Sequence, residues 1–224
     1  MLSRANGNFL TPFLLAYFLL KISAAPLCAQ NNRLVDPDSI NRLNTLGREM
    51  LDRVPDSALK YSEKALEAAE ETNFKRGMAE AMTNLGFYYL DRAEYASSYE
   101  YFNRVYSLRL DMQDSVGMTE SLANLAAVYR QRGLYPEARQ YLLEALELAR
   151  QLDHRGLLAT LYKDLGGVSY FIQNYEEAQQ YFQESLNYIN PTRELVTYAA
   201  VLNNIGVVYK AWNRNTLALE YLQK

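Results

Sequence analysis

The chain repeats one pattern of residues at intervals of forty positions, and this period limits the fold more than any other feature of its 224 residues. Segments of similar sequence begin at Asn84, Asn124, Asp164 and Asn204. A fixed period of this length is typical of a solenoid, in which each unit buries its apolar face against the next. A weaker copy begins at Asp36, so the sequence contains about four and a half units.

Each unit divides into two amphipathic halves joined by a short polar segment. Around Asn124 the first half places Leu122, Leu125 and Tyr129 at helical spacing, and the second half does the same with Ala138 and Leu142. Two helices of about 17 residues with two short turns account for the period. We therefore predict an all-α solenoid of antiparallel helix pairs.

A small residue recurs inside the first half, although glycine in a helix costs about 1 kcal/mol relative to alanine. Gly86 and Gly166 are examples, and a second small residue follows twelve positions later, at Ser98 and Ala178. We expect these pairs to mark a close crossing of the two helices in a unit.

The repeated residues resemble those of the tetratricopeptide repeat family. The resemblance rests on leucine–glycine pairs such as Leu85-Gly86, on the aromatic residue three positions later, such as Tyr89, and on alanines such as Ala138 near the start of the second helix. A period of forty instead of the common 34 is similar to the longer branch seen in kinesin light chains and in N-terminal regions of bacterial sensor and regulator proteins. The resemblance implies a right-handed superhelical solenoid with a concave groove.

The first 29 residues have the pattern of a secretory signal peptide. Arg4 precedes the apolar stretch Phe9–Leu20, and small residues lead to Ala29. The apolar stretch is too short to span a bilayer comfortably. We expect cleavage after Ala29 and export, to the periplasm. Lipidation of Cys28 and an uncleaved membrane anchor are the alternatives.

This leader sets the expected domain organisation. A linker at residues 30–37 would follow it, and the repeat domain would occupy residues 38–224, truncated at the C-terminus. Loss of the leader with its two basic residues would move the net charge from −3 to −5. An acidic chain without a basic run is a poor candidate for binding nucleic acid.

The sequence offers no arrangement of residues for catalysis or metal binding. After residue 29 it contains a single histidine, His154, and no cysteine. A metal site or a catalytic triad needs several such groups together. Gly166-Gly167 lies inside an expected helix, not between a strand and a helix as in a phosphate-binding loop. We expect a protein that is not an enzyme and that uses no metal and no cofactor.

Polar residues recur at one position of the first helix and are the candidates for ligand binding. Helix propensity does not favour asparagine there. In the resembled family this position faces the groove, where amides hydrogen-bond the backbone of a bound peptide. A hydrogen bond to the neighbouring unit is the alternative, and one amide can serve both purposes. The candidate groove residues are Asn84, Asn124, Asp164, Asn203, Asn204, Arg130, Lys163, Tyr170 and Lys210.

The charges among these candidates favour an acidic or carboxylate-bearing ligand. Arg130, Lys163 and Lys210 would place positive charge on the inner face of an acidic protein, although Glu120 and Asp164 would offset part of it. The expected function is that of a scaffold that holds a peptide or protein segment in the groove.

The last unit suggests further alternatives. Asn190 and Pro191 are expected to cap and begin its first helix. Its second helix reaches only Lys224 and leaves Leu219 and Leu222 without a polar capping helix. We therefore expect a fragment of a longer protein or a truncated gene product. The alternative to the scaffold is the N-terminal sensory region of a bacterial sensor histidine kinase or transcriptional regulator, with a membrane segment only beyond Lys224. Self-association through the open C-terminal end is another alternative.

Overall fold

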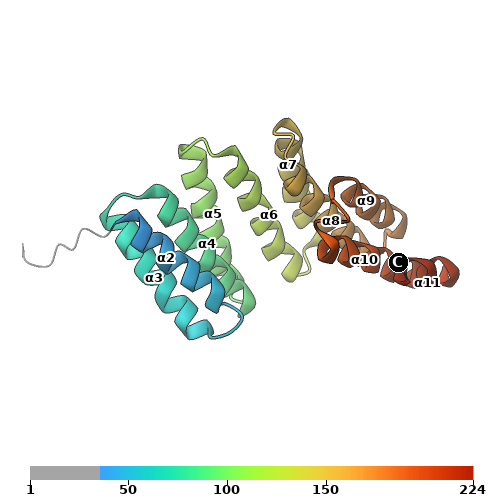
Figure 1. Ribbon diagram of the computed structural model, residues 1–224, viewed down its shortest axis with the longest axis horizontal. Coiled ribbons are helices and arrows are strands. Elements are labelled where there is room, and N and C mark those ends of the chain that lie inside the picture. Colours follow the sequence, from blue (N-terminus) through green and yellow to red (C-terminus); the bar gives the residue numbers. More distant parts are fainter. Residues whose placement is uncertain (1–35, 224) are drawn as a thin grey trace, which may run out of the picture. The chain divides into compact units, whose positions relative to one another are not determined.

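The computed structural model describes residues 36–223, and within them it contains ten α-helices and no strand (Figure 1). The helices are α2 (Pro37–Met50), α3 (Pro55–Glu71), α4 (Lys75–Asp91), α5 (Tyr95–Asp111), α6 (Ser115–Gln131), α7 (Tyr135–Gln151), α8 (Arg155–Phe171), α9 (Tyr175–Tyr188), α10 (Leu195–Ala211) and α11 (Asn215–Leu222). The expected signal peptide at residues 1–29 lies outside the described residues.

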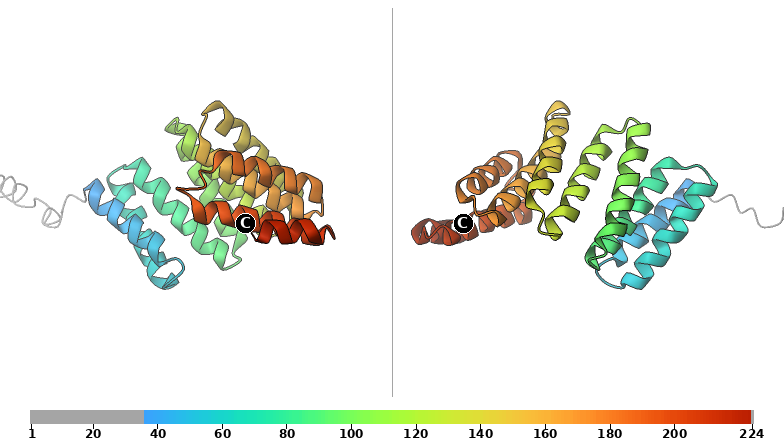
Figure 2. Two further views of the ribbon diagram at one scale, coloured as in Figure 1. Left: turned by 45° about the vertical axis from the view of Figure 1, so that its right-hand side comes forward. Right: turned by 180° about the vertical axis from the view of Figure 1, so that it is seen from behind.

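Each helix packs against the next one along the chain, so the unit Pro37–Lys224 is an array of helix pairs (Figure 2). The pairs α2–α3, α4–α5, α6–α7, α8–α9 and α10–α11 form the repeats. Most helices contain 17 residues, as the period predicts. The predicted all-α solenoid of antiparallel helix pairs is confirmed.

Seven turns share one backbone geometry, with a residue of positive φ directly after the helical cap. These residues are Asn73, Ala93, Gln113, Gly133, Asp153, Gln173 and Asn213. In each turn the following N–H donates to the carbonyl five residues earlier, as from Phe74 to Ala69 at 2.8 Å. This pattern satisfies the last carbonyls of a helix and usually uses glycine, because glycine has no Cβ to clash at positive φ. Only one of the seven positions has glycine, so the other six carry some backbone strain.

In two repeats the recurring glycine of the first helix lies against an aromatic side chain of the second helix. A Cβ on Gly86 would come within 2.5 Å of the Phe102 ring, and a Cβ on Gly166 within 2.8 Å of the Phe182 ring. The repeat with alanine at this place, Ala126, has the smaller Leu142 opposite it in the sequence register. The close crossing is confirmed, but the nearest atoms belong to the bulky residue and not to the small residue twelve positions on.

The α9–α10 connection differs from the sequence prediction. Asn190 caps no helix: its Oδ1 accepts from the backbone N–H groups of Thr192 and Arg193 at 3.0 and 3.2 Å. These bonds close a local turn, and α10 begins only at Leu195, forty residues after the start of α8. The prediction that Pro191 begins the helix is wrong because the asparagine side chain stabilises the turn in place of a helical N-terminus.

Candidate functional site

A cavity of about 850 Å³ opens along the first helices of the N-terminal repeats; we call it the first cavity. It is lined by Asn44, Thr45, Arg48, Arg76, Glu80, Thr83, Asn84, Phe87, Arg109, Asp114, Val116, Gly117, Glu120 and Asn124. These residues come from α2, α4 and α6, with Arg109 from α5 and Asp114 from the turn before α6. The cavity exists because α2 packs against α4, whereas α4 and α6 barely touch among the described helices.

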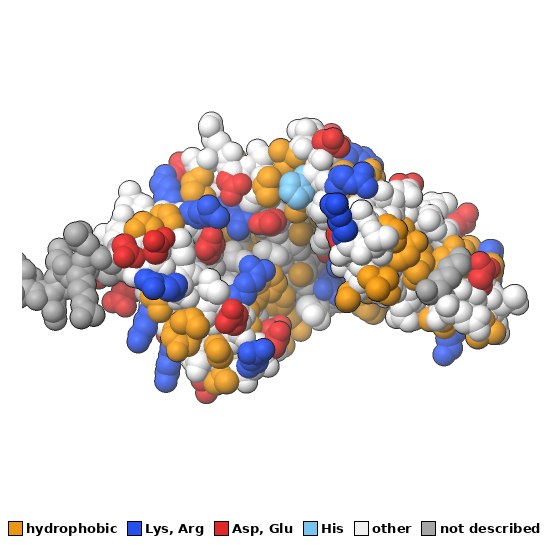
Figure 3. Space-filling model, viewed as in Figure 1, with side chains coloured by type: hydrophobic (Ala, Val, Ile, Leu, Met, Phe, Trp, Pro, Cys, Tyr) orange, Lys and Arg blue, Asp and Glu red, His pale blue; other side chains and the backbone are white. Residues whose placement is uncertain are grey.

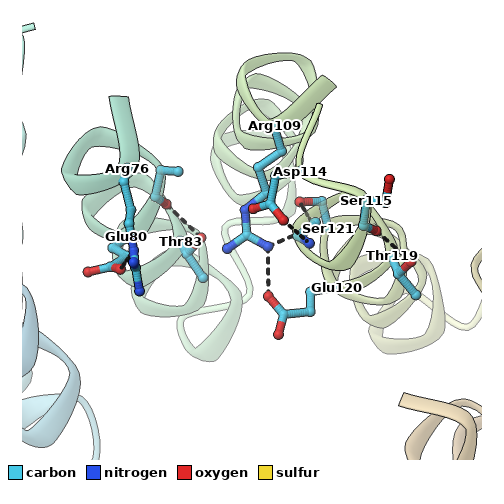
Figure 4. A network of polar contacts seen from close by, with 11 residues as sticks. Arg76, Glu80, Thr83, Arg109, Asp114, Ser115, Thr119, Glu120 and Ser121 are labelled. Carbon is cyan, nitrogen blue, oxygen red and sulfur yellow. Dashed lines mark hydrogen bonds and ion pairs between the residues drawn. The ribbon is translucent and has the colours of Figure 1, made fainter. Parts of the chain in front are cut away.

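Most charges around the first cavity are paired with one another (Figure 4). Arg109 donates to the Gly117 carbonyl and to Glu120, both at 2.7 Å, and only 11% of its side chain is exposed. Arg76 pairs with Glu80 at 3.2 Å along α4. Side chains of both signs are interspersed over the hollowed face of the molecule in Figure 3. This wall therefore presents polar groups with little net charge to a ligand.

Asn84 is a structural residue of this wall as well as a lining residue. Its Nδ2 donates to the Asn44 backbone carbonyl at 2.9 Å, and Asn44 in turn donates to the Gly77 carbonyl at 3.0 Å. Both side chains are buried. The alternative reading, a hydrogen bond across the repeat boundary, therefore holds for Asn84, while Asn124 and Asn204 remain partly exposed.

A second cavity of about 440 Å³ lies along α6, α8 and α10. It is lined by Arg130, Lys163, Asp164, Gly167, Tyr170, Phe171, Phe182, Asn204, Val207 and Val208. Two cations and one carboxylate face an apolar surface, in which Phe171 is 50% exposed and Val207 38%. Such a mixture of charged and exposed apolar groups is typical of a binding pocket.

The carboxylate of the second cavity is held in an unfavourable environment. Burial raises the pKa of Asp164 above its ordinary value, although Lys163 and Arg130 both act to lower it. The Lys163 Nζ lies 3.7 Å from the Asp164 Oδ1, and a third of the Asp164 side chain is exposed. Arg130 forms no ion pair with another described residue.

Gly167 gives the second cavity an open wall. A Cβ at this position would meet no atom within 4 Å, in contrast to the neighbouring Gly166. The equivalent positions of the other repeats carry Phe87, Ala127 and Val207. Internal packing therefore does not require glycine here, and the missing side chain lets another molecule approach the α8 backbone.

The structure brings most of the predicted groove residues together, in two groups. The first cavity contains Asn84 and Asn124, and the second contains Arg130, Lys163, Asp164, Tyr170 and Asn204. Asn203 and Lys210 are exposed on α10 and line neither cavity.

The sequence analysis missed several lining residues of the first cavity. Thr45 could have been found, because the alignment of Leu46-Gly47 with Leu85-Gly86 places it at the position of Asn84. Arg109 could not, because it reaches the cavity from a second helix and no repeat equivalent marks it.

A metal-binding site is not apparent among residues 36–223. The structure places no group of three or more His, Cys, Asp or Glu where they could hold a metal ion. His154 is exposed at the start of α8, where its Nδ1 accepts from the Leu157 N–H at 3.2 Å. None of these helices combines the length and apolar character needed to cross a membrane.

The family model of the tetratricopeptide repeat matches residues 118–190, which cover α7, α8 and α9 and most of α6. Residues 118–190 are therefore similar to tetratricopeptide repeats. The helix pairs and the forty-residue period show that these repeats extend on both sides of the matched segment. No curated protein sequence matches the chain at a significant level.

Solved structures with the same fold share little sequence with the repeat chain. BtubC (BKLC) from P. vanneervenii superposes with a TM-score of 0.72 at 19% identity, over 85% of this chain and 82% of its own. The Rap conjugation gene regulator of plasmid pLS20, in complex with a peptide, gives 0.69 at 17%, over 97% of this chain and 63% of the regulator. A STAND protein with a tetratricopeptide repeat sensor from Pyrococcus horikoshii gives 0.66 at 18%, over 78% of this chain and 27% of that protein. These similarities establish the fold.

Proposed function

We propose that this chain is a non-enzymatic scaffold that holds an extended peptide or protein segment along its first helices. The observation that carries the proposal is the pair of cavities along α2, α4, α6, α8 and α10, lined by polar and exposed apolar side chains. The partly exposed amides of Asn124 and Asn204, two repeats apart, each offer a donor and an acceptor to a peptide backbone. The peptide complex of the structurally similar conjugation gene regulator supports this proposal.

Peptide-array binding to the full chain tests the proposal. We expect a subset of peptides to bind, and the double substitution of Asn124 and Asn204 by alanine to weaken binding at least about tenfold, since that is the size of one good interface contact. Asn103→Ala is the matched control, because Asn103 is exposed on the second helix α5. Equal binding by the double variant and the control would refute the groove.

We also propose that the protein is exported and acts as the sensory region of a larger bacterial signalling protein. The support is the leader pattern with Arg4 and Phe9–Leu20, together with the sensor and regulator roles of two structurally similar proteins. N-terminal sequencing of the protein from the periplasmic fraction should begin at Gln30. A protein that stays in the cytoplasm with Met1 in place would contradict export.

A further inference from the structure

The two cavities differ in their charge balance. In the first cavity three arginines are balanced by three carboxylates, and Arg76 and Arg109 pair with Glu80 and Glu120. The second cavity contains two cations, Arg130 and Lys163, and the single carboxylate of Asp164, which pairs with Lys163 alone among the described residues. An anionic group of a ligand is therefore attracted more strongly to the second cavity.

The surroundings of the cations fit a peptide carboxylate. Asn204 adds an amide donor from α10, and Phe171 and Val207 offer exposed apolar surface next to the charges. Gly167 leaves the α8 backbone open between these two groups of residues. A peptide with an acidic residue next to an apolar one can thus place its backbone against α8.

We infer that the second cavity binds the carboxylate of an acidic peptide through Arg130, Lys163 and Asn204, in competition with Asp164. This inference extends the proposed function and rests on it. In the free protein Asp164 partly neutralises the two cations. A ligand carboxylate takes over these interactions and brings a second negative charge close to Asp164.

This competition makes binding dependent on pH. Among the helices packed against α8, only α6 presents a charged group to Asp164, namely Arg130; α7, α9 and α10 present none among the described residues. Lys163 is the charged group on α8 itself. Protonation of Asp164 removes the repulsion, so an acidic ligand binds more tightly as the pH falls while its own carboxylate stays ionised.

The test uses the full chain and the fluorescein-labelled, C-terminally amidated octapeptide Ser-Gly-Leu-Glu-Phe-Leu-Gly-Ser, with anisotropy as the readout. A matched peptide has Gln in place of Glu. A third peptide, Ser-Gly-Leu-Gln-Phe with a free C-terminus, distinguishes a terminal carboxylate from a side-chain carboxylate. We expect the Glu peptide or the free C-terminus to bind at least about fivefold more tightly than the Gln peptide, as for one favourable charge interaction screened as strongly as in bulk water.

Four variants assign this preference to the cavity. Arg130→Gln and Lys163→Gln should each weaken binding of the preferred acidic peptide about fivefold, and Asp164→Asn should strengthen it by a similar factor. Asparagine is safe for folding there, because three other repeats carry it at this position. Lys210→Gln is the charge control: Lys210 lies outside both cavities, and its effect should stay within about twofold.

Two further experiments distinguish a change in ligand binding from a change in protein folding. As the pH falls towards the ordinary pKa of a peptide carboxylate, affinity should rise in the parent protein and stay flat in Asp164→Asn. Gly167→Ala should weaken binding although the added Cβ meets no atom of the protein.

The outcomes separate this inference from the proposed function. Equal binding of all three peptides, with no effect of Asp164→Asn, overturns the acidic subsite but leaves the scaffold in place. Absence of binding by any peptide here and on the array overturns both.

Discussion

Two adjacent glycines of α8 allow the packing of a repeat to be measured directly. A Cβ on Gly166 would lie 2.8 to 2.9 Å from three ring atoms of Phe182, whose side chain is 3% exposed. Ordinary carbon contacts begin near 3.5 Å, so the ring must move in a filled core. Such overpacking costs about 1–3 kcal/mol. At Gly167 the added Cβ meets nothing.

Both substitutions to alanine gain about 1 kcal/mol of helix propensity. This gain cancels when the two variants are compared, because they occupy neighbouring positions of one helix. Gly167→Ala should therefore be stabilised by up to about 1 kcal/mol, and Gly166→Ala should be less stable than Gly167→Ala by about 1–3 kcal/mol. Urea unfolding of the full chain, followed by far-ultraviolet circular dichroism, measures the difference.

A second substitution identifies the clashing partner. Phe182→Leu reproduces the pairing of Ala126 with Leu142 and should restore most of the stability that Gly166→Ala loses. The double-mutant cycle should give a favourable coupling of about 0.5–3 kcal/mol. Gly166→Ala that is as stable as Gly167→Ala, or a coupling near zero, would refute the assignment of this glycine to helix crossing.

Three other features give separate predictions. Asn84→Ala should lower the free energy of unfolding by about 0.5–1.5 kcal/mol because it removes a buried hydrogen bond to the Asn44 carbonyl, whereas Asn124→Ala, at a partly exposed site, should change it far less in the same urea titration. Ala93→Gly should raise the thermal midpoint, since positive φ costs a non-glycine residue about 1–2 kcal/mol; a lower midpoint would show that the turn is not strained. Because burial raises the folded-state pKa of Asp164, its contribution to stability is complete below the unfolded pKa and is lost as the pH rises through the folded pKa. Asp164→Asn should therefore make thermal stability less dependent on pH in that window, and an unchanged profile would contradict the raised pKa.

The sequence predicted the helix pairs because apolar spacing and the forty-residue period act locally and repeat. It failed at Asn190, where one side chain stabilises a turn that periodicity cannot detect. It also placed the glycine opposite a small residue instead of the Phe102 ring, since sequence spacing does not give the direction in which a large side chain points.

Only part of the candidate groove could be predicted from the sequence, because the repeat register shows which residues share a position but not how the units pack. The repeat register identified Asn124, Asp164 and Asn204 because each occupies the same position of a first helix. The division into two cavities depends on the wider separation of α4 from α6, which is a property of packing between units. The reach of Arg109 from α5 to Glu120 depends on three-dimensional proximity alone.

Among the described helices, every substantial interface joins elements that are one or two places apart along the chain. Loss of order at one interface therefore need not spread to distant repeats, and short-range opening events can occur independently. A ligand that touches α6, α8 and α10 at once makes such openings unfavourable together. Occupancy of the second cavity would thus turn loosely coupled segments into a single cooperative block.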